Sequence, residues 1–302
     1  MTADPYHFEV TCPARLDRFL AQQLRLSRAQ AQRLIEQSQV QVNQHRAVKG
    51  LMLQPHDVVQ VPAFDRPQDQ RAIPHDDPRV IELAHQSGWV MVNKPAGMPI
   101  HPLKPGETST LLNTVIARYP QIHSLGEGGL RSGVVHRLDL GTTGVVAFAL
   151  DTATWHTFRQ AFVDHTTRKT YRALVHGHPP SQGHQECPLR IARHKPAHVV
   201  VGPGHDQRLC RLAWRVRHLL TDAAEIEVDL ETGFLHQIRV MFAHMGHPLL
   251  GDTQYGAVDR WPRPMLHATC LDIGDAHGQC DPPDDYLATR QTLLPPSPPL
   301  GV

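Results

Sequence analysis

This chain lacks the features that would place it in a membrane or among disulfide-stapled secreted proteins. No apolar run approaches the roughly 18 residues that a membrane-spanning helix needs, although apolar residues make up 40% of the 302. The N-terminus, MTADPYHFEV, has no basic stretch followed by an apolar one, so no signal peptide is expected. The five cysteines form no CxxC pair, and their odd number favours reduced thiols in a cytoplasmic protein.

The chain also lacks an overall charge, because 30 basic and 29 acidic residues leave a net charge of +1. The basic residues are nevertheless concentrated in two stretches. Residues 14–62 hold seven basic against three acidic residues, and residues 188–220 hold seven against one. Positive charge in chosen places on a neutral chain suits a polyanionic partner, although a solvated charged face explains either stretch about as well.

The length favours two domains, and the first is expected at residues 14–62 as a small αα-ββ module. Apolar residues recur at helical spacing over 16–24. The stretch Ser27-Arg28-Ala29-Gln30 has the pattern of a capping box that opens a second helix. Two runs then alternate as strands do, QVQVN at 39–43 and DVVQV at 57–61.

The rest of the chain predicts a linker, a larger domain and a tail. Residues 63–78 are polar and contain proline, so we expect a linker, and the Pro-rich residues 291–302 are expected to form a tail that does not pack. Residues 79–290 contain many strand-like runs and few helices. That composition predicts an α+β fold with a mixed, largely antiparallel β-sheet and flanking helices.

Individual elements of this second domain can be predicted from their patterns. Asp151 is expected to cap a helix, and LHQIRVMFAHMG at 235–246 is expected to form another. The run EIEVDLE at 225–231 alternates perfectly, which predicts one buried and one exposed face. The other predicted strands are WVMVN at 89–93, GVVAFAL at 144–150 and KTYRALVHG at 169–177.

The stretch VVHRLDLGTTG at 134–144 places a carboxylate between two apolar runs. Burying an unpaired charge costs several kcal/mol, so Asp139 needs a cation or several N–H donors. Arg137 is near in sequence, and Arg239 is a plausible long-range partner that would keep the carboxylate ionised. Taken alone, the loop is explained more simply by a structural ion pair than by catalysis.

Four ordered blocks change this interpretation. The chain contains NKPAGMPIHP at 93–102, VHRLDLGTTG at 135–144, KTYRALVHG at 169–177 and LETGFLHQIRVMFAHMGHPLLGD at 230–252. With these blocks the sequence resembles the RluA-type pseudouridine synthases, whose signature loop is His-Arg-Leu-Asp followed by Thr-Ser-Gly. Its first unit resembles the S4 RNA-binding module, and the two resemblances together cover about residues 14–275.

The resemblance implies that uridine is isomerised to pseudouridine in structured RNA by base flipping, glycosidic-bond cleavage and re-formation through C5. Asp139 would be the catalytic carboxylate, Tyr171 would stack on the uracil and help remove the C5 proton, and Arg239 would pair with Asp139. Arg137 would hold a phosphate or the displaced strand. The other expected RNA contacts are His136, Lys94, His236, Arg28 and Arg33. An isomerisation implies no cofactor and no catalytic metal.

Several alternatives stay open. Asp139 could attack C1′ or remove a proton from C2′. Ribosomal RNA is favoured as the target by analogy, transfer RNA is possible, and a monomer is expected. A rival from another class is an RNA-binding protein of the same fold without catalysis. A metal hydrolase is a second rival, but no Cys or acid completes the histidine groups at metal spacing, which are His194 with His198, and His236 with His244 and His247.

The sequence departs from the family pattern at a few positions. Thr143 stands where serine is usual, and Phe234-Leu235 stands where an Arg-Thr pair is usual. In the S4-like module, Gln44 and His56 occupy turn positions where glycine is common, and a positive φ there would cost more without glycine. These departures leave Asp139, Tyr171 and Arg239 in place but put the RNA target in question.

Overall fold

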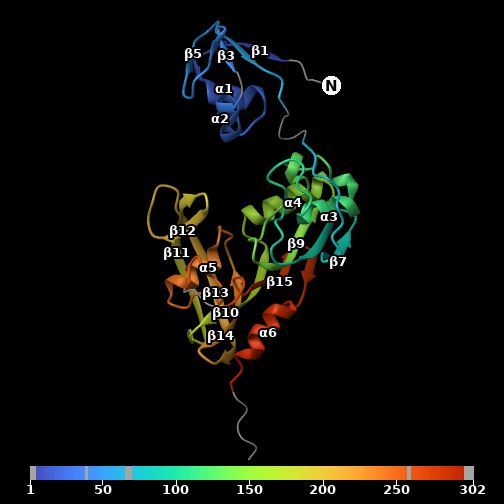
Figure 1. Cartoon of the computed structure of the whole chain (residues 1–302), viewed down its shortest axis with the longest axis vertical. Helices are drawn as coiled ribbons and strands as arrows, with labels where there is room; N and C mark the ends of the chain where they lie inside the picture. The colour runs from blue at the N-terminus through green and yellow to red at the C-terminus, as the bar shows by residue number, and fades with distance from the viewer. Residues whose placement is uncertain (1–4, 38–39, 65–69, 257–259, 296–302) are drawn as a thin grey trace, which may run out of the picture. The chain divides into compact units, whose positions relative to one another are not determined.

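The computed structural model describes residues 5–37, 40–64, 70–256 and 260–295 and divides the chain into two compact units, 1–66 and 67–302 (Figure 1). Each unit has its own core of buried apolar side chains. The boundary between the units falls within the expected linker. Residues 296–302 of the expected tail lie outside the described residues, whereas its first residues do pack: 291 and 292 end a helix, and Leu293 contacts a cluster of buried apolar side chains. Within the described residues, no helix has both the length and the apolar character needed to cross a membrane.

The second half of the expected linker packs against the second unit. Ala72 is buried in its core, and Asn113 donates a hydrogen bond to the carbonyl of Ile73 at 2.6 Å. The amide of Asp77 donates to Thr114 Oγ1 at 3.2 Å. Polar and backbone contacts of this kind leave no apolar periodicity, which is why the sequence pattern suggested a linker here.

The first unit packs two helices against short strands. The helices are α1 (Leu16–Gln23) and α2 (Arg28–Gln37). The strands are β1 (Tyr6–Glu9), β2 (Ala14–Arg15), β3 (Gln41–Val42), β4 (His45–Arg46), β5 (Met52–Leu53) and β6 (Val58–Val61), in sheets ordered β1-β6-β3-β4 and β2-β5. The predicted capping box is confirmed: Ser27 N donates to Gln30 Oε1 at 2.7 Å, and Gln30 N donates to Ser27 Oγ at 3.2 Å.

The β3–β4 turn carries a strained residue, which gives a first prediction. Asn43 and Gln44 have φ of 51° and 67°, the conformation of a two-residue turn that favours Asn-Gly. A left-handed conformation costs a non-glycine residue roughly 1–2 kcal/mol, and replacing that residue with glycine removes this cost. The greater freedom of glycine in the unfolded chain offsets about 0.4–1 kcal/mol of the stability gained. Gln44→Gly is therefore expected to stabilise the first unit by about 0.5–1 kcal/mol.

Native-state hydrogen exchange of the first unit's amides in the full chain measures this change. Gly50→Ala is the matched opposite, because Gly50 has φ of 85° with open space around it, and it should accelerate exchange. Slower exchange in the Gly50→Ala variant, or faster exchange in the Gln44→Gly variant, would contradict the assignment of strain to this turn.

The second unit is built on a large mixed sheet with the order β12-β11-β13-β14-β10-β15-β9-β8-β7, and β16 pairs with β15. Its pairings are antiparallel except that of β9 with β15. The strands are β7 (Ile81–Gln86), β8 (Trp89–Lys94), β9 (Thr143–Ala149), β10 (Arg168–His176), β11 (Gln182–His194), β12 (Ala197–Val201), β13 (Arg208–Leu220), β14 (Ala223–Leu230), β15 (Leu266–Ile273) and β16 (Ala276–Gln279). The predicted α+β class and largely antiparallel sheet are confirmed.

Helices flank this sheet at both ends. The α-helices are α3 (Leu111–Arg118), α4 (Thr152–Val163), α5 (Gln237–His244) and α6 (Asp284–Thr292). In Figure 1, α3 and α4 gather at the β7–β9 end, whereas α5 lies by β11–β13. Asp151 caps α4 as predicted, because its Oδ1 accepts a hydrogen bond from Thr154 N at 2.8 Å. The loop before β9 and the N-terminus of α5 carry the candidate site.

The prediction of an exposed face on β14 holds only toward its C-terminal end, where Asp229 and Glu231 are exposed. Glu225 and Glu227 alternate with apolar residues as expected, yet both are buried. Helix α6 covers Glu225, which accepts hydrogen bonds from Tyr286 Oη and Arg290 at 3.3 and 3.2 Å. Burial alone would raise the pKa of Glu225, but hydrogen bonds and charges from His218, Arg172 and Arg290 hold it below its usual value. A buried sheet face whose carboxylates are ion-paired therefore has the same alternation of charged and apolar residues as a solvent-exposed face.

Candidate active site

A cavity of about 440 Å³ lies where the loop before β9, strand β10 and the start of α5 meet. This volume is within the range of pockets that hold small ligands. Six of the expected site residues line it: Asp139, Tyr171, Arg239, His136, Arg137 and His236. The tertiary structure thus brings together residues from three blocks that are far apart in sequence.

Asp139 is paired with Arg239, as the sequence led us to expect. Arg239 Nη1 donates to Asp139 Oδ2 at 3.2 Å. The same guanidinium makes shorter bonds to Asp252, with Nε to Oδ2 at 2.7 Å and Nη2 to Oδ1 at 2.9 Å. Asp252 is fully buried, so it fixes the plane of Arg239 by a two-point contact. Asp139 then receives one donor from a cation that is already held in place.

Burial disfavours the charged form of Arg239, but the nearby Asp252 and Asp139 outweigh it and raise its pKa. Arg239 therefore carries its charge at any physiological pH. Asp139 keeps 19% of its side chain exposed, facing the cavity. The result is a carboxylate with one oxygen anchored and the other open to the cavity, an arrangement that suits nucleophilic or basic chemistry.

Lys94 corrects one of the expected RNA contacts. Its side chain is fully buried and donates hydrogen bonds to the carbonyls of Pro95, Met98 and Leu140, at 2.9, 3.0 and 3.1 Å. Burial lowers the pKa of Lys94 to about 7. Lys94 therefore cannot reach RNA, and it fixes the residue that follows Asp139 in the loop. Arg263 does the same one residue later, donating to the carbonyl of Gly141 at 3.1 Å.

Tyr171 lies on β10 with 9% of its surface exposed. Among the described residues, none forms a hydrogen bond with its hydroxyl. Burial and the nearby charge of Asp139 raise the pKa of Tyr171, so the phenol stays protonated at neutral pH. A buried ring whose hydroxyl faces a cavity without a protein partner is suited to contact with a ligand.

His136 and Arg137 have different surroundings although they are adjacent. The ring of His136 stacks on Phe162 with centroids 4.7 Å apart, and its Nε2 accepts a hydrogen bond from Ala147 N at 2.9 Å. Burial lowers the pKa of His136 to about 3, so it is neutral and part of the cavity wall. Arg137 is exposed at the same cavity, where it can reach a phosphate.

His236 is oriented by a residue that the sequence did not single out. Its Nδ1 lies 2.7 Å from Tyr255 Oη, and its Nε2 lies 3.9 Å from Asp139 Oδ2. The Arg239 guanidinium lies over the Tyr255 ring at 5.1 Å, and Tyr255 Oη accepts from Val199 N at 3.0 Å. Tyr255 thus ties β12 to both His236 and Arg239. Burial lowers the pKa of His236, so this ring is also neutral.

Sequence reasoning missed several residues of this site, of which four bear directly on its polar contacts. Asp252 and Tyr255 support Arg239, and both fall in or just after the HPLLGD block. Lys169 and Thr142 line the cavity. Lys169 shares a strand face with Tyr171 at i+2 spacing, and Thr142 lies in the signature loop, so these two could have been found from spacing. The roles of Asp252 and Tyr255 depend on contacts that no local pattern encodes.

Lys169 and Thr142 both place polar groups at the cavity. The Lys169 ammonium donates to the carbonyl of Thr232 at 3.3 Å, and burial lowers its pKa to about 8. The hydroxyl of Thr142 is buried without a hydrogen-bond partner among the described residues. Phe234 and Leu235, where the family pattern has an Arg-Thr pair, supply an apolar wall instead.

The remaining predicted residues lie elsewhere. In the first unit Arg28 pairs with the buried Asp17 at 2.9 Å, whereas Arg33 is exposed. His194 and His198 lie on the β11–β12 hairpin rather than on one helix, where Ala197 and Arg193 are their respective strand partners. His198 stacks on the Tyr255 ring, with centroids 5.1 Å apart. Helical metal spacing therefore does not apply to this pair.

Comparison with known proteins finds matches for both units. Residues 88–244 match the family model of RNA pseudouridylate synthase, and residues 14–59 match the S4 domain. A protein of Chloroflexus aurantiacus described as an uncharacterised RNA pseudouridine synthase is 36% identical over 263 residues, 86% of this chain and 81% of that protein. A ribosomal large subunit pseudouridine synthase D of Zymomonas mobilis is 36% identical, over 80% of this chain and 77% of that protein.

The fold has solved counterparts. The human RNA pseudouridylate synthase domain containing 1 is similar with a TM-score of 0.57 and 25% identity, over 70% of this chain and 85% of that one. The family model spans the loop of Asp139, strand β10 and the start of α5, which are the segments that form the cavity. The chain therefore belongs to the RNA pseudouridylate synthases, the enzymes that isomerise uridine to pseudouridine in RNA, and it carries an S4 domain before its catalytic domain.

Proposed function

We propose that the cavity takes a uridine flipped out of a structured ribosomal RNA and that Asp139 carries out the first chemical step. The observation that supports this most directly is the carboxylate of Asp139 at the cavity wall, paired with Arg239 while Asp252 holds that guanidinium from behind. A base must leave the stack before its glycosidic bond can be reached, and a cavity of about 440 Å³ can hold one nucleotide.

The reaction needs an ionised carboxylate close to the ribose. In one route Asp139 attacks C1′ as the N1–C1′ bond breaks, and in the other it removes the C2′ proton and leaves a glycal. In either route the freed uracil rotates, C5 bonds to C1′, and the C5 proton is lost while nitrogen regains one. No net oxidation occurs, so the residues present suffice for the chemistry. Arg239 holds one oxygen of Asp139 in place in both routes.

The other cavity residues suit the binding of a flipped uridine. The Tyr171 ring offers a stacking surface, and base stacking on an aromatic ring contributes about 1–3 kcal/mol. Since its phenol is protonated, Tyr171 can accept the C5 proton only if it passes its own proton to a neighbour. Asp139 is the neighbouring charged group. The unpartnered hydroxyl of Thr142 and the exposed guanidinium of Arg137 suit ribose and phosphate contacts respectively.

The proposal of ribosomal RNA rests on the relatives and on the S4 domain. Two of the similar proteins, from Zymomonas mobilis and Nitrosomonas europaea, are named ribosomal large subunit pseudouridine synthase D. Transfer RNA is the alternative target. Pseudouridine mapping of total RNA from cells with and without this protein tests the proposal, and we expect one or a few sites in large-subunit ribosomal RNA to disappear.

Complementing the cells that lack this protein with the wild-type or a variant chain shows which lost pseudouridines depend on Asp139. The wild-type chain should restore each lost site, whereas the Asp139→Asn variant should restore none. Lost sites confined to transfer RNA would overturn the ribosomal target but keep the activity. An unchanged map, together with RNA binding in vitro, would favour the catalytically silent RNA-binding protein. The expectations of a monomer and of a cytoplasmic location stay predictions.

The S4 domain gives a prediction about salt. Four of its arginines are exposed and make no ion pair among the described residues: Arg18, Arg25, Arg33 and Arg46. If these contact phosphates, deleting residues 1–66 should weaken RNA binding and make the slope of log K against log salt shallower by up to about 3. Filter binding at several salt concentrations measures this slope.

The same fragment tests the domain boundary. Residues 67–302 hold a separate core, so the fragment should stay folded by circular dichroism. A salt slope equal to that of the full chain would show that the S4 domain does not contact the RNA backbone.

A further inference from the structure

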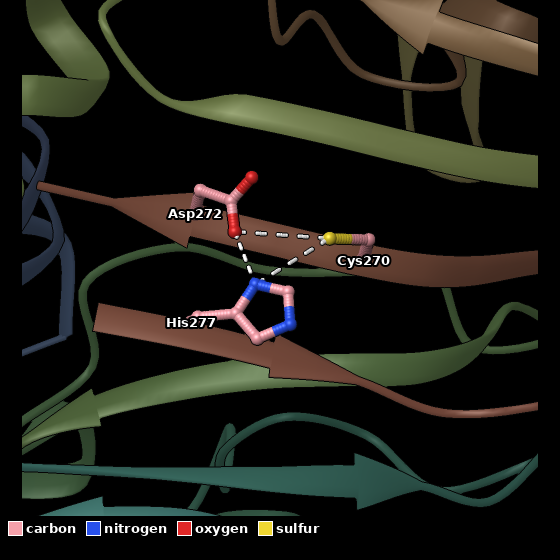
Figure 2. A group of neighbouring side chains, drawn as sticks. All are labelled: Cys270, Asp272 and His277. Carbon is pink, nitrogen blue, oxygen red and sulfur yellow. Dashed lines mark hydrogen bonds and ion pairs between the residues drawn. The ribbon is translucent and has the colours of Figure 1, made fainter. Parts of the chain in front are cut away.

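Three side chains of metal-ligating type gather on the β15–β16 hairpin, and Figure 2 shows them converging on one point. Cys270 and Asp272 belong to β15 and His277 belongs to β16. Cys270 Sγ lies 3.8 Å from Asp272 Oδ1 and 4.0 Å from His277 Nδ1, and that Oδ1 and Nδ1 are 2.5 Å apart. Of the described residues, only these form a group of three His, Cys, Asp or Glu with ligand atoms all within 4.8 Å.

This group does not belong to the active site. In β10, Lys169 lines the cavity and is the strand partner of Leu271, whereas Thr170 is the partner of Cys270. Successive side chains of a strand point to opposite faces. Cys270 and Asp272 therefore face away from the cavity, on the side of Thr170.

The hairpin holds the three side chains in register before any ion arrives. Asp272 and His277 are direct partners across the two strands, and Cys270 precedes Asp272 by two residues on the same face. The connection between the strands is short, with Ile273 paired to Ala276. All three ligands thus fall within eight residues, 270–277, so little chain entropy is lost when they converge.

The distances fit an ion after small movements. Zn–S bonds of about 2.3 Å and Zn–N or Zn–O bonds of about 2.0–2.1 Å in a tetrahedron place S and N about 3.6 Å apart, and N and O about 3.3 Å apart. The sulfur contacts need to shorten by a few tenths of an ångström, and the hydrogen bond between His277 and Asp272 must open by less than about 1 Å. Rotation about side-chain torsions covers both changes.

We propose that Cys270, Asp272 and His277 bind a divalent transition-metal ion of the Zn²⁺ class, with water at the fourth position, and that the ion links β16 to β15. Thiolate, imidazole and carboxylate together suit Zn²⁺ better than hard cations such as Mg²⁺. On binding, Cys270–SH exchanges its proton for the metal, so one S–H bond breaks, one S–metal bond forms, and H⁺ leaves to solvent. The proton of the His277–Asp272 hydrogen bond moves to Nε2 of His277 through solvent, and Nδ1 and Oδ1 each then form a bond to the metal, so the net release is the one proton from Cys270.

The local charge and the solvent exposure of the three side chains both permit metal binding. The thiolate and Asp272 together neutralise a dication, and the neighbouring Arg168 and Asp229 on the same sheet face offset one another. The side chain of Asp272 is 31% exposed and that of His277 is 56% exposed, so an ion can enter from solvent. The site is separate from the proposed function, and its test needs no RNA.

Co²⁺ is the probe, because thiolate coordination gives a near-ultraviolet charge-transfer band and a tetrahedral site gives intense visible bands. Titrating the reduced full-length chain should develop both bands to one equivalent, with release of one proton. Adding Zn²⁺ should bleach them. Cys270→Ser should remove the charge-transfer band. His277→Gln should weaken Co²⁺ binding at least about 100-fold, since even losing an outer partner costs about 10–100-fold.

Cys12→Ser is the matched control, because Cys12 is an exposed free thiol outside the group. It should leave both bands unchanged. Circular dichroism of each variant confirms that the surface substitutions leave the fold intact. Absence of a charge-transfer band in the wild-type chain at millimolar Co²⁺ would overturn the proposal, as would a band that survives in Cys270→Ser.

Discussion

Asp139→Asn is expected to lower the single-turnover rate of pseudouridine formation by at least about 10³-fold, because the amide can neither attack carbon nor accept a proton. The substitution keeps the size and shape of the side chain. RNA affinity should therefore stay within about threefold of wild type. Quantitative pseudouridine detection with enzyme in excess over RNA measures the rate, and a filter assay measures the affinity.

The fold should tolerate this substitution, for a reason that the structure supplies. Arg239 keeps two bonds to the buried Asp252 when the charge at Asp139 is lost, so no buried charge is left unpaired. Asp222→Asn, at an exposed turn with φ of 53°, is the control and should be fully active. A rate within tenfold of wild type in Asp139→Asn would remove this residue from the chemistry.

Tyr171→Phe and Tyr171→Ala are expected to differ in a way that separates stacking from proton transfer. Phe keeps the ring, so RNA affinity should hold, but loss of the hydroxyl should slow product formation by about 10²-fold or more. We expect this variant to cleave the glycosidic bond and stall before product. Ala also removes the ring, which should weaken binding of RNA with a flipped uridine analogue by about 10–100-fold, the equivalent of about 1–3 kcal/mol.

Stability provides the second measurement. Among the described residues the Tyr171 hydroxyl has no partner, so Phe should change the free energy of unfolding by less than about 0.5 kcal/mol. Ala empties a buried volume and should cost about 3 kcal/mol. Tyr119→Phe is the control for the loss of a phenol hydroxyl outside the cavity, because the Tyr119 hydroxyl donates to Glu82 at 2.8 Å. A fully active Tyr171→Phe enzyme would leave Tyr171 a stacking surface at most.

Local patterns were enough for elements whose stabilising contacts are local. The capping box at Ser27 and the cap of α4 by Asp151 are made by side chains three residues from their partners, so the spacing predicts them. The apolar runs that became β8, β9 and β10 are buried on both faces, and such runs are recognisable without context. The pairing of Asp139 with Arg239 could be expected from a general cost, since a carboxylate inside a fold needs a cation or several N–H donors.

Long-range contacts decided what the sequence left open. The resemblance implied that Lys94 contacts RNA, yet three backbone carbonyls from two loops surround it. Glu225 and Glu227 alternate as an exposed face would, yet α6 and cross-strand arginines cover them. In both cases the residue type is compatible with either environment, and only its neighbours in space distinguish them.

The sequence by itself therefore determined the family, the order of the two domains and the identity of the residues expected to do the chemistry, because these depend on ordered motifs and on local spacing. Only the tertiary structure decided how those residues are held. Asp252 and Tyr255 fix Arg239 and His236 from another segment, and Lys94 and Arg263 fix the loop of Asp139 from beneath. Such support depends on hydrogen bonds between residues far apart in the chain, and no periodicity or short motif records which of many polar residues will meet.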